Sequence, residues 1–274
     1  MNESLISARP QGLRFKALRI DTKVARRFVS PLALVLAWQL GSSLHLVPAA
    51  KLAAPATILA TFWSLSASGE LLRDLAVSLG RVLVGFGVGV SIGATLALIA
   101  GLSSAGDDAV DPVMQALRTL PYLGMSPLLI LWFGIGEFPK LALVTFASAF
   151  PVYLTLLGGI RAVDPKLVEA AHAFGLNRWQ TIRAVILPSA LAPTLVGLRY
   201  ALGAAWLSLV VSEQINADRG IGYLIMDARD FLRTDVIVVG LLVYAVLGLA
   251  TDAVVRMAEK RALIWRPSLV RDAR

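Results

Sequence analysis

Residues 82–101 read VLVGFGVGVSIGATLALIAG, a stretch without a single charged side chain, and this stretch decides the fold. A helix rises 1.5 Å per residue, so about 20 apolar residues cross the ~30 Å hydrocarbon layer of a bilayer. A small residue recurs at every fourth position, which places these residues on one ridge where another helix can approach closely. The ridge consists of Gly85, Gly89, Gly93, Ala97 and Gly101. We expect it to pack against a neighbouring span.

Composition indicates that this span is one of several. Hydrophobic residues make up 57% of the 274 residues, charged residues make up 16%, and the mean hydropathy is +0.72. Soluble domains carry roughly 25% charged residues. The expected spans are residues 28–46, 82–101, 113–133, 141–160, 189–211 and 236–255. We therefore expect an all-α membrane protein with six transmembrane helices.

The third expected span differs from the others because polar and helix-breaking residues interrupt it. These residues are Arg118, Pro121, Gly124 and Pro127. A broken helix at membrane depth is tolerated where it faces protein or a water-lined path rather than lipid. We therefore expect residues 113–133 to form a broken span.

Lysine and arginine set the expected orientation, since short cytoplasmic loops carry an excess of both. They gather in residues 1–27, 161–188 and 256–274, and six crossings put these regions on one side. Both termini are therefore expected in the cytoplasm, with a transmembrane domain at 28–257 between a basic N-terminus (1–27) and a basic tail (258–274). A secretory signal peptide is the alternative interpretation of the N-terminus. The net charge of +8 could indicate nucleic acid, but the basic residues stand beside apolar spans, so no nucleic-acid partner is expected.

Several kinds of chemistry are excluded by what the sequence lacks. It contains no cysteine and only two histidines, His45 and His172, which excludes disulfides, thiol nucleophiles and histidine-rich metal sites. It contains no Gly-x-x-x-x-Gly-Lys-Ser/Thr loop that would hold nucleotide phosphates. We expect no catalytic residue, no metal and no cofactor on this chain. A membrane-embedded enzyme stays a distant alternative.

The most informative polar connection is residues 164–188, DPKLVEAAHAFGLNRWQTIRAVILP, between the fourth and fifth spans. Asp164 followed by proline is typical of a helix start. Gly175 suits the left-handed residue that closes a helix. Asn177 can cap a second short helix, which Pro188 is expected to end. The segment predicts an elbow of two short helices on the cytoplasmic side, shaped to enter a groove on a soluble partner.

The elbow resembles the cytoplasmic signature of permease subunits of bacterial ATP-binding-cassette importers. The pattern is Glu-Ala-Ala, three residues, glycine, nine residues, an aliphatic residue, one residue and Leu-Pro. It matches Glu169, Ala170, Ala171, Gly175, Val185, Leu187 and Pro188. The one departure is Val185, where the family usually has isoleucine.

This resemblance implies a type I ABC importer permease fold. It also implies that the elbow couples to a dimer of separate ATPase subunits, which bind ATP and magnesium. Glu169 would then fix the elbow or meet the ATPase. The alternative is that it merely pairs with Arg178 or Lys166.

Other segments resemble the branch of this family that imports aliphatic sulfonates, taurine or nitrate. They are residues 74–81, 131–136, 159–161, 164–165, 222–225 and 231–235. The resemblance implies a multi-pass protein of the bacterial inner membrane that works with a second permease copy (a homodimer), a periplasmic or lipid-anchored substrate-binding protein, and membrane lipids. Aliphatic sulfonates are the expected cargo. Taurine, nitrate or a pyrimidine precursor are alternatives.

Charged residues inside a span are costly and are therefore functional candidates. Arg199, in the fifth span, carries a guanidinium that matches the geometry of an anion such as a sulfonate. The alternative is that Arg199 pairs with an acid of another span and fixes the packing. Trp206, Ser212 and Glu213 follow on the same helix and complete the expected substrate path, although a tryptophan is more often a core residue. Asp252 is expected to pair with Arg256, four residues further on.

Overall fold

The computed structural model describes residues 22–46, 48 and 50–264. These residues are helical almost throughout, and none of them forms a strand. This confirms the expected all-α class. Residues 1–21 and 265–274, which carry much of the two expected basic termini, lie outside the described residues.

The helices lie close in sequence and are joined by short connections. In chain order they are α1 (Thr22–Ser43), α2 (Pro55–Ala67), α3 (Glu70–Leu102), α4 (Ser104–Arg118), the 3-10 turn η1 (Tyr122–Met125), α5 (Ser126–Phe133), α6 (Glu137–Arg161), α7 (Pro165–Ala173), α8 (Arg178–Thr181), the π-helical turn η2 (Ile182–Ile186), α9 (Leu187–Asn216), α10 (Ile221–Asp230) and α11 (Thr234–Ala262).

Four helices of the described chain are long and apolar enough to cross a membrane: α3, α6, α11 and the continuous helix Arg178–Ile215, which includes all of α9 but its last residue. The pair formed by α4 and the segment Tyr122–Phe133 makes a fifth if the two bent parts count as one span, and α1 contributes a shorter apolar stretch, Val29–Ser43. The expected number of six spans therefore stays a prediction.

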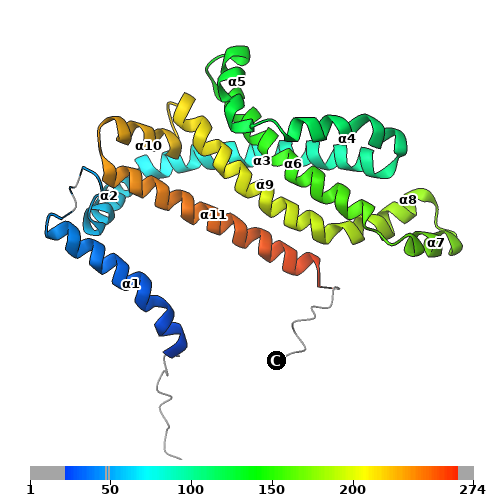
Figure 1. Cartoon of the computed structure of the whole chain (residues 1–274), viewed down its shortest axis with the longest axis horizontal. Coiled ribbons are helices and arrows are strands. Elements are labelled where there is room, and N and C mark those ends of the chain that lie inside the picture. The colour runs from blue at the N-terminus through cyan, green and yellow to red at the C-terminus, as the bar shows by residue number, and fades with distance from the viewer. Residues whose placement is uncertain (1–21, 47, 49, 265–274) are drawn as a thin grey trace, which may run out of the picture.

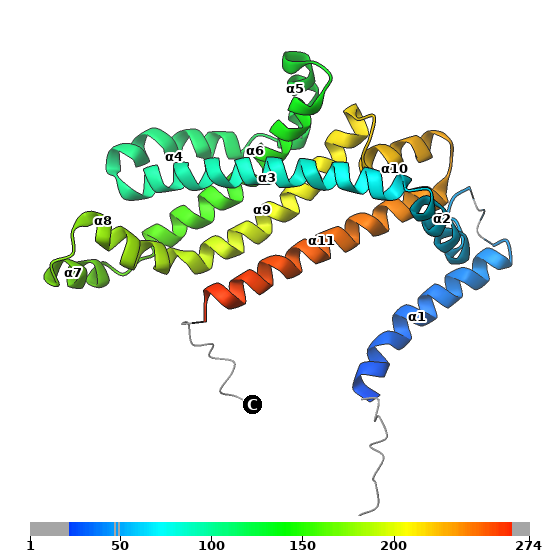
Figure 2. The same cartoon turned by 180° about the vertical axis from the view of Figure 1, so that it is seen from behind.

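The core is a layer of three helices in which α6 packs against both α3 and α9 (Figures 1 and 2). The small-residue ridge on α3 faces α6, because a Cβ atom added at Gly89 would lie 2.5 Å from the carbonyl oxygen of Thr145. A Cβ added at Gly93 would overlap the carbonyl of Ala149. Glycine is required at both positions for the backbones to approach this closely. This confirms the predicted packing role of the ridge.

The bundle has two distinct ends. We call the end that carries α7 and α8 the elbow end, and the opposite end, where α2 and α10 lie, the α10 end (Figures 1 and 2). At the α10 end, the hydroxyl of Thr61 in α2 donates a 2.6 Å hydrogen bond to Asp235 in α11. At the elbow end, Tyr153 of α6 donates a 2.7 Å hydrogen bond to Asp111 of α4. Both ends are therefore joined by polar contacts between helices that are distant in sequence.

Two expected spans have different bounds in the structure. The second belongs to a longer helix, α3, which begins at Glu70 and includes the charged side chains of Asp74 and Arg81, both buried. In place of the third, α4 and the segment Tyr122–Phe133 meet at an angle of 84°. Pro121 lies in the break. A proline disfavours helical geometry at the residue before it and lacks the N–H that would continue the helix, so the helix is interrupted there.

The expectation that Pro188 ends a helix is wrong. The helix that begins at Arg178 runs through η2 into α9 without interruption, and Pro188 lies in the first turn of α9. A proline has no N–H group to donate to the preceding turn. In a regular α-helix its ring would also clash with the carbonyl of the residue four positions earlier. The wider π-turn that precedes Pro188 opens the backbone there, which lets the helix continue.

Candidate functional site

The elbow has the local geometry that its sequence predicts. The side chain of Asp164 caps α7 by accepting a 2.9 Å hydrogen bond from the backbone N–H of Lys166. Gly175 lies between the two short helices with a φ of +80°, in the left-handed region. Asn177 and Gln180 cap α8 reciprocally, through side chain-to-backbone hydrogen bonds of 2.9 and 2.8 Å. The chain therefore reverses direction within a few residues, and the left-handed φ at Gly175 favours glycine.

Three large apolar side chains are exposed on the elbow. Phe174 is 85% exposed, Trp179 is 65% exposed and Leu167 is 51% exposed. Large apolar residues that cluster on a surface are typical of a protein–protein contact. Ala170 is also exposed, whereas Ala171 is buried. The elbow therefore exposes three large apolar side chains and the small side chain of Ala170.

Few contacts tie the elbow to the bundle. Arg178 donates a 2.6 Å hydrogen bond to the carbonyl oxygen of Leu102, at the end of α3. The last carbonyls of a helix have no partner within the helix, and a positive charge is favourable there. A cavity of about 350 Å³ separates the elbow from α3, with Val168 and His172 among its lining residues. Glu169 is exposed and forms no ion pair within the described part of the chain, so the alternative pairing with Arg178 or Lys166 does not occur.

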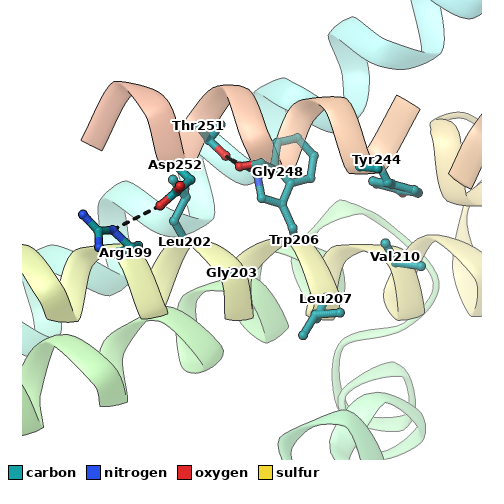
Figure 3. Close-up of a pocket in the computed structure, with 11 residues that line it drawn as sticks. Arg199, Leu202, Gly203, Trp206, Leu207, Val210, Tyr244, Gly248, Thr251 and Asp252 are labelled. Atoms are coloured by element: carbon teal, nitrogen blue, oxygen red, sulfur yellow. Dashed lines mark hydrogen bonds and ion pairs between the residues drawn. The ribbon is translucent and has the colours of Figure 1, made fainter. Parts of the chain in front are cut away.

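A second candidate region is a cavity of about 490 Å³ between α9 and α11 (Figure 3). Arg199 lies at one end of it and forms ion pairs with Asp252 at 3.1 Å and with Glu259 at 2.6 Å. Asp252 also pairs with Arg256 at 2.8 Å, which confirms that expectation. Trp206 lines the same cavity and donates a 3.2 Å hydrogen bond to Thr251 (Figure 3). Arg199 therefore pairs with acidic residues of another helix, which was the alternative to a role in cargo binding. Its contact with cargo stays a prediction.

The other two residues of the expected substrate path do not line this cavity. Ser212 is 3% exposed and its hydroxyl donates to the carbonyl of Leu209 in its own helix. Glu213 is 1% exposed and lies at the α10 end. The structure thus separates the four path candidates into a pair beside the cavity and a buried pair further along α9.

Glu213 is the centre of a buried polar network at the α10 end, which we call the Glu213 cluster. Four groups donate hydrogen bonds to its carboxylate: the hydroxyl of Ser78 at 2.9 Å, Nη1 of Arg81 at 2.7 Å, the N–H of Gly222 at 2.9 Å and the hydroxyl of Tyr244 at 3.1 Å. These donors come from α3, α10 and α11. A buried carboxylate is tolerated only when it is paired and hydrogen-bonded in this way. The cluster therefore fixes three helices around the end of α9.

Arg81 extends this cluster to the start of α6. Its Nε and Nη2 atoms donate to the two carboxylate oxygens of Glu137, at 2.7 and 2.6 Å. Lys140 donates to the same carboxylate at 3.0 Å. The polar face of α3 could have been found from the sequence, because Asp74, Ser78 and Arg81 are spaced four and three apart and share one helix face. No local pattern indicates that Glu137 and Glu213 are the partners of Arg81, or that Asp74 accepts from the N–H of Gly220. Among the described residues, no group of three acidic or histidine side chains is arranged to hold a metal ion.

Comparisons with known proteins agree with these features. Residues 89–264 match the family described as the inner membrane component of binding-protein-dependent transport systems. A Bacillus subtilis protein named as an aliphatic sulfonates transport permease is 42% identical over 97% of this chain and 96% of its own length. An Escherichia coli protein of the same name is 46% identical over 87% of this chain and 90% of its own. The taurine transport system permease of Escherichia coli is 36% identical over 71% of each chain.

Solved structures share the fold. A crystal structure of an amino acid ABC transporter with histidines superposes with a TM-score of 0.58 at 21% identity, covering 72% of this chain and 96% of that one. A methionine ABC transporter in an inward-facing conformation gives a TM-score of 0.53 at 18% identity, covering 66% and 92% of the two chains. The fold is therefore that of an ABC importer permease, and the chain belongs to the family of inner-membrane components of binding-protein-dependent transport systems.

Proposed function

We propose that this chain is the permease subunit of an importer that carries small organosulfonate anions across the bacterial inner membrane. The relatives named for aliphatic sulfonates support this cargo, because they match most of the chain at 42% and 46% identity. Taurine is the second candidate, because the relative named for it is 36% identical. Taurine is itself a sulfonate that also carries an amino group, so the two candidates share an anionic head.

In this proposal, the elbow docks into a groove on a separate ATPase subunit. The observation that carries the proposal is the exposure of Phe174 and Trp179 on a rigidly capped turn that has few contacts with its own bundle. The exposed, unpaired carboxylate of Glu169 would meet a basic or N–H group of the ATPase. Leu187 and Pro188 join the elbow to α9 without a break, so a movement of the docked elbow passes directly into a membrane-spanning helix.

The assembly that we propose contains two copies of this chain, a dimer of ATPase subunits that bind ATP and magnesium, and a substrate-binding protein. The chain would cross the membrane six times, with the first crossing at residues 28–46 and both termini in the cytoplasm. The elbow end then faces the cytoplasm, and the α10 end faces the binding protein. The two copies would rock against each other to expose the cargo path to alternate sides.

The cargo path in this proposal runs along α9. Arg199 and Trp206 line its part beside the cavity between α9 and α11. Ser212 and Glu213 contribute at the α10 end, where Glu213 acts by positioning Arg81 rather than by touching cargo.

Transport by the reconstituted complex tests the proposal. The chain is reconstituted into liposomes with its partner ATPase subunit and substrate-binding protein, and uptake of labelled ethanesulfonate and taurine is measured with and without ATP. We expect ATP-dependent uptake of ethanesulfonate that exceeds the uptake of taurine. If the assembled complex hydrolyses ATP but takes up neither compound, the proposed cargo is wrong.

A further inference from the structure

We propose that Arg81 and Lys140 form a binding site for the anionic head of the cargo, and that Glu137 occupies this site as an internal substitute for the cargo anion. The identity of the anion rests on the proposed function. The existence of an anion site rests on the geometry of these three side chains alone.

The burial of the three groups is unequal. Arg81 is 6% exposed and Lys140 is 3% exposed, whereas the side chain of Glu137 is 55% exposed. Two buried cations thus converge on one carboxylate that faces outward. Burying a charge is costly unless it is paired. Glu137 can rotate into open space, but the two buried cations cannot follow it. Its departure would leave Lys140 unpaired and the edge of Arg81 formed by Nε and Nη2 without an acceptor.

Arg81 is held in place independently of Glu137. Its Nη1 atom donates to Glu213 at 2.7 Å and to the carbonyl oxygen of Arg219 at 2.6 Å. The opposite edge, formed by Nε and Nη2, is the edge that Glu137 occupies. A guanidinium edge of this kind binds two oxygen atoms of a carboxylate or phosphate side by side. The tetrahedral sulfonate group also presents two oxygen atoms to such an edge, so the Glu213 cluster keeps a sulfonate-binding edge in a fixed orientation.

Two neighbouring features suit an aliphatic sulfonate. Glu137 is the first residue of α6, and a helix N-terminus favours negative charge through its free N–H groups. The apolar side chains of Ile135 and Phe138 flank it in sequence and are 85% and 57% exposed. An anion bound at Arg81 and Lys140 therefore has apolar surface nearby for its alkyl part.

Competition between Glu137 and the cargo anion follows from this arrangement. The carboxylate of Glu137 keeps the two cations paired while no cargo is present, and the sulfonate displaces it when cargo arrives. Removal of the internal carboxylate should therefore strengthen anion binding, whereas removal of Lys140 as well should weaken it.

The test measures the thermal stability of the full chain, purified with its ATPase, against the concentration of methanesulfonate. Dimethyl sulfone is the probe control, since it has nearly the same shape and no charge. We expect Glu137→Gln to lower the methanesulfonate concentration for half-maximal stabilisation by about tenfold, since a hydrogen-bonded charged competitor is lost. The double variant Glu137→Gln with Lys140→Gln should lose this gain. Glu70→Gln, which changes an exposed glutamate at the same end, is the matched control and should behave as wild type.

Three results would overturn the site. The first is an equal response of Glu137→Gln and wild type, and the second is an equal response to methanesulfonate and dimethyl sulfone. The third is a gain of anion binding in Glu259→Gln, which removes one of the two acidic partners of Arg199, but not in Glu137→Gln. If Glu137→Gln does not fold, Glu137→Asp replaces it, because the shorter carboxylate is a weaker competitor and should produce a smaller gain of the same sign. Anion binding without uptake in the transport assay would refute the proposed function and leave the site intact. Uptake in the transport assay, without a gain of anion binding in Glu137→Gln, would refute the site and leave the proposed function intact.

Discussion

Replacement of Gly175 tests how strongly coupling depends on the shape of the elbow. Gly175 has a φ of +80°, and a Cβ atom added there would meet no other atom within 4 Å. A side chain at this position therefore collides with nothing, and the whole penalty comes from the backbone conformation. We expect Gly175→Val to assemble normally and to lose the stimulation of ATP hydrolysis by cargo-loaded binding protein.

The size of the effect follows from the left-handed conformation. An L-residue in this region costs about 1–2 kcal/mol, and a β-branched residue is at the upper end or beyond it. A penalty of about 2 kcal/mol lowers the equilibrium constant for the native elbow by roughly 30-fold, since 1.4 kcal/mol corresponds to a factor of ten. Asparagine tolerates the left-handed region better than other residues with a side chain. The expected order of residual stimulation is therefore Gly175→Asn, then Gly175→Ala, then Gly175→Val.

The assay is ATP hydrolysis by the reconstituted complex, with and without cargo-loaded binding protein. Gly158→Ala is the matched control, because Gly158 lies in a regular helix, also has no atom within 4 Å of an added Cβ and does not have a positive φ. It should keep the stimulation of the wild type. Full stimulation in Gly175→Val, or the same loss in all three Gly175 variants, would refute the argument from backbone conformation.

Two further predictions concern stability. Glu213→Ala should destabilise the chain by about 3–5 kcal/mol, because it removes one of the two carboxylates paired with Arg81 and leaves the buried donors Ser78, Gly222 and Tyr244 without this acceptor; thermal unfolding in detergent measures this, and a melting temperature equal to that of wild type would contradict it. Gly93→Leu should destabilise by about 1–3 kcal/mol through overpacking against Ala149. Gly87→Leu lies on the same helix with open space around it and should change little, so equal effects of the two leucine substitutions would contradict the packing argument.

The features that the sequence predicts correctly are those that local chemistry determines. The caps at Asp164 and Asn177 act on backbone groups two or three residues away, and the positive φ of Gly175 follows from a helix that ends beside another helix start. The ridge on α3 follows from spacing alone. These elements need no knowledge of which helix lies next to which.

The features that the sequence does not predict depend on distant partners. The charges of Asp74 and Arg81 suggest that a span begins after them, yet both are buried in α3, because Glu137, Glu213 and the N–H of Gly220 satisfy them. The ion pairs of Arg199 with Asp252 and Glu259 likewise join residues more than fifty positions apart. Continuation of the helix through Pro188 depends on a π-turn that no composition rule indicates.

Contact between the elbow and the ATPase is the central claim, and site-directed crosslinking tests it most directly. The chain contains no cysteine, so a single cysteine can be placed at will. Phe174→Cys puts it on the elbow, and Trp63→Cys puts it at the opposite, α10 end of the bundle, where the side chain is 75% exposed. In membranes that contain the complex, a cysteine-specific photoreactive reagent should join Phe174→Cys to the ATPase subunit and should not join Trp63→Cys to it. Crosslinking of the ATPase from Trp63→Cys and not from Phe174→Cys would contradict the account.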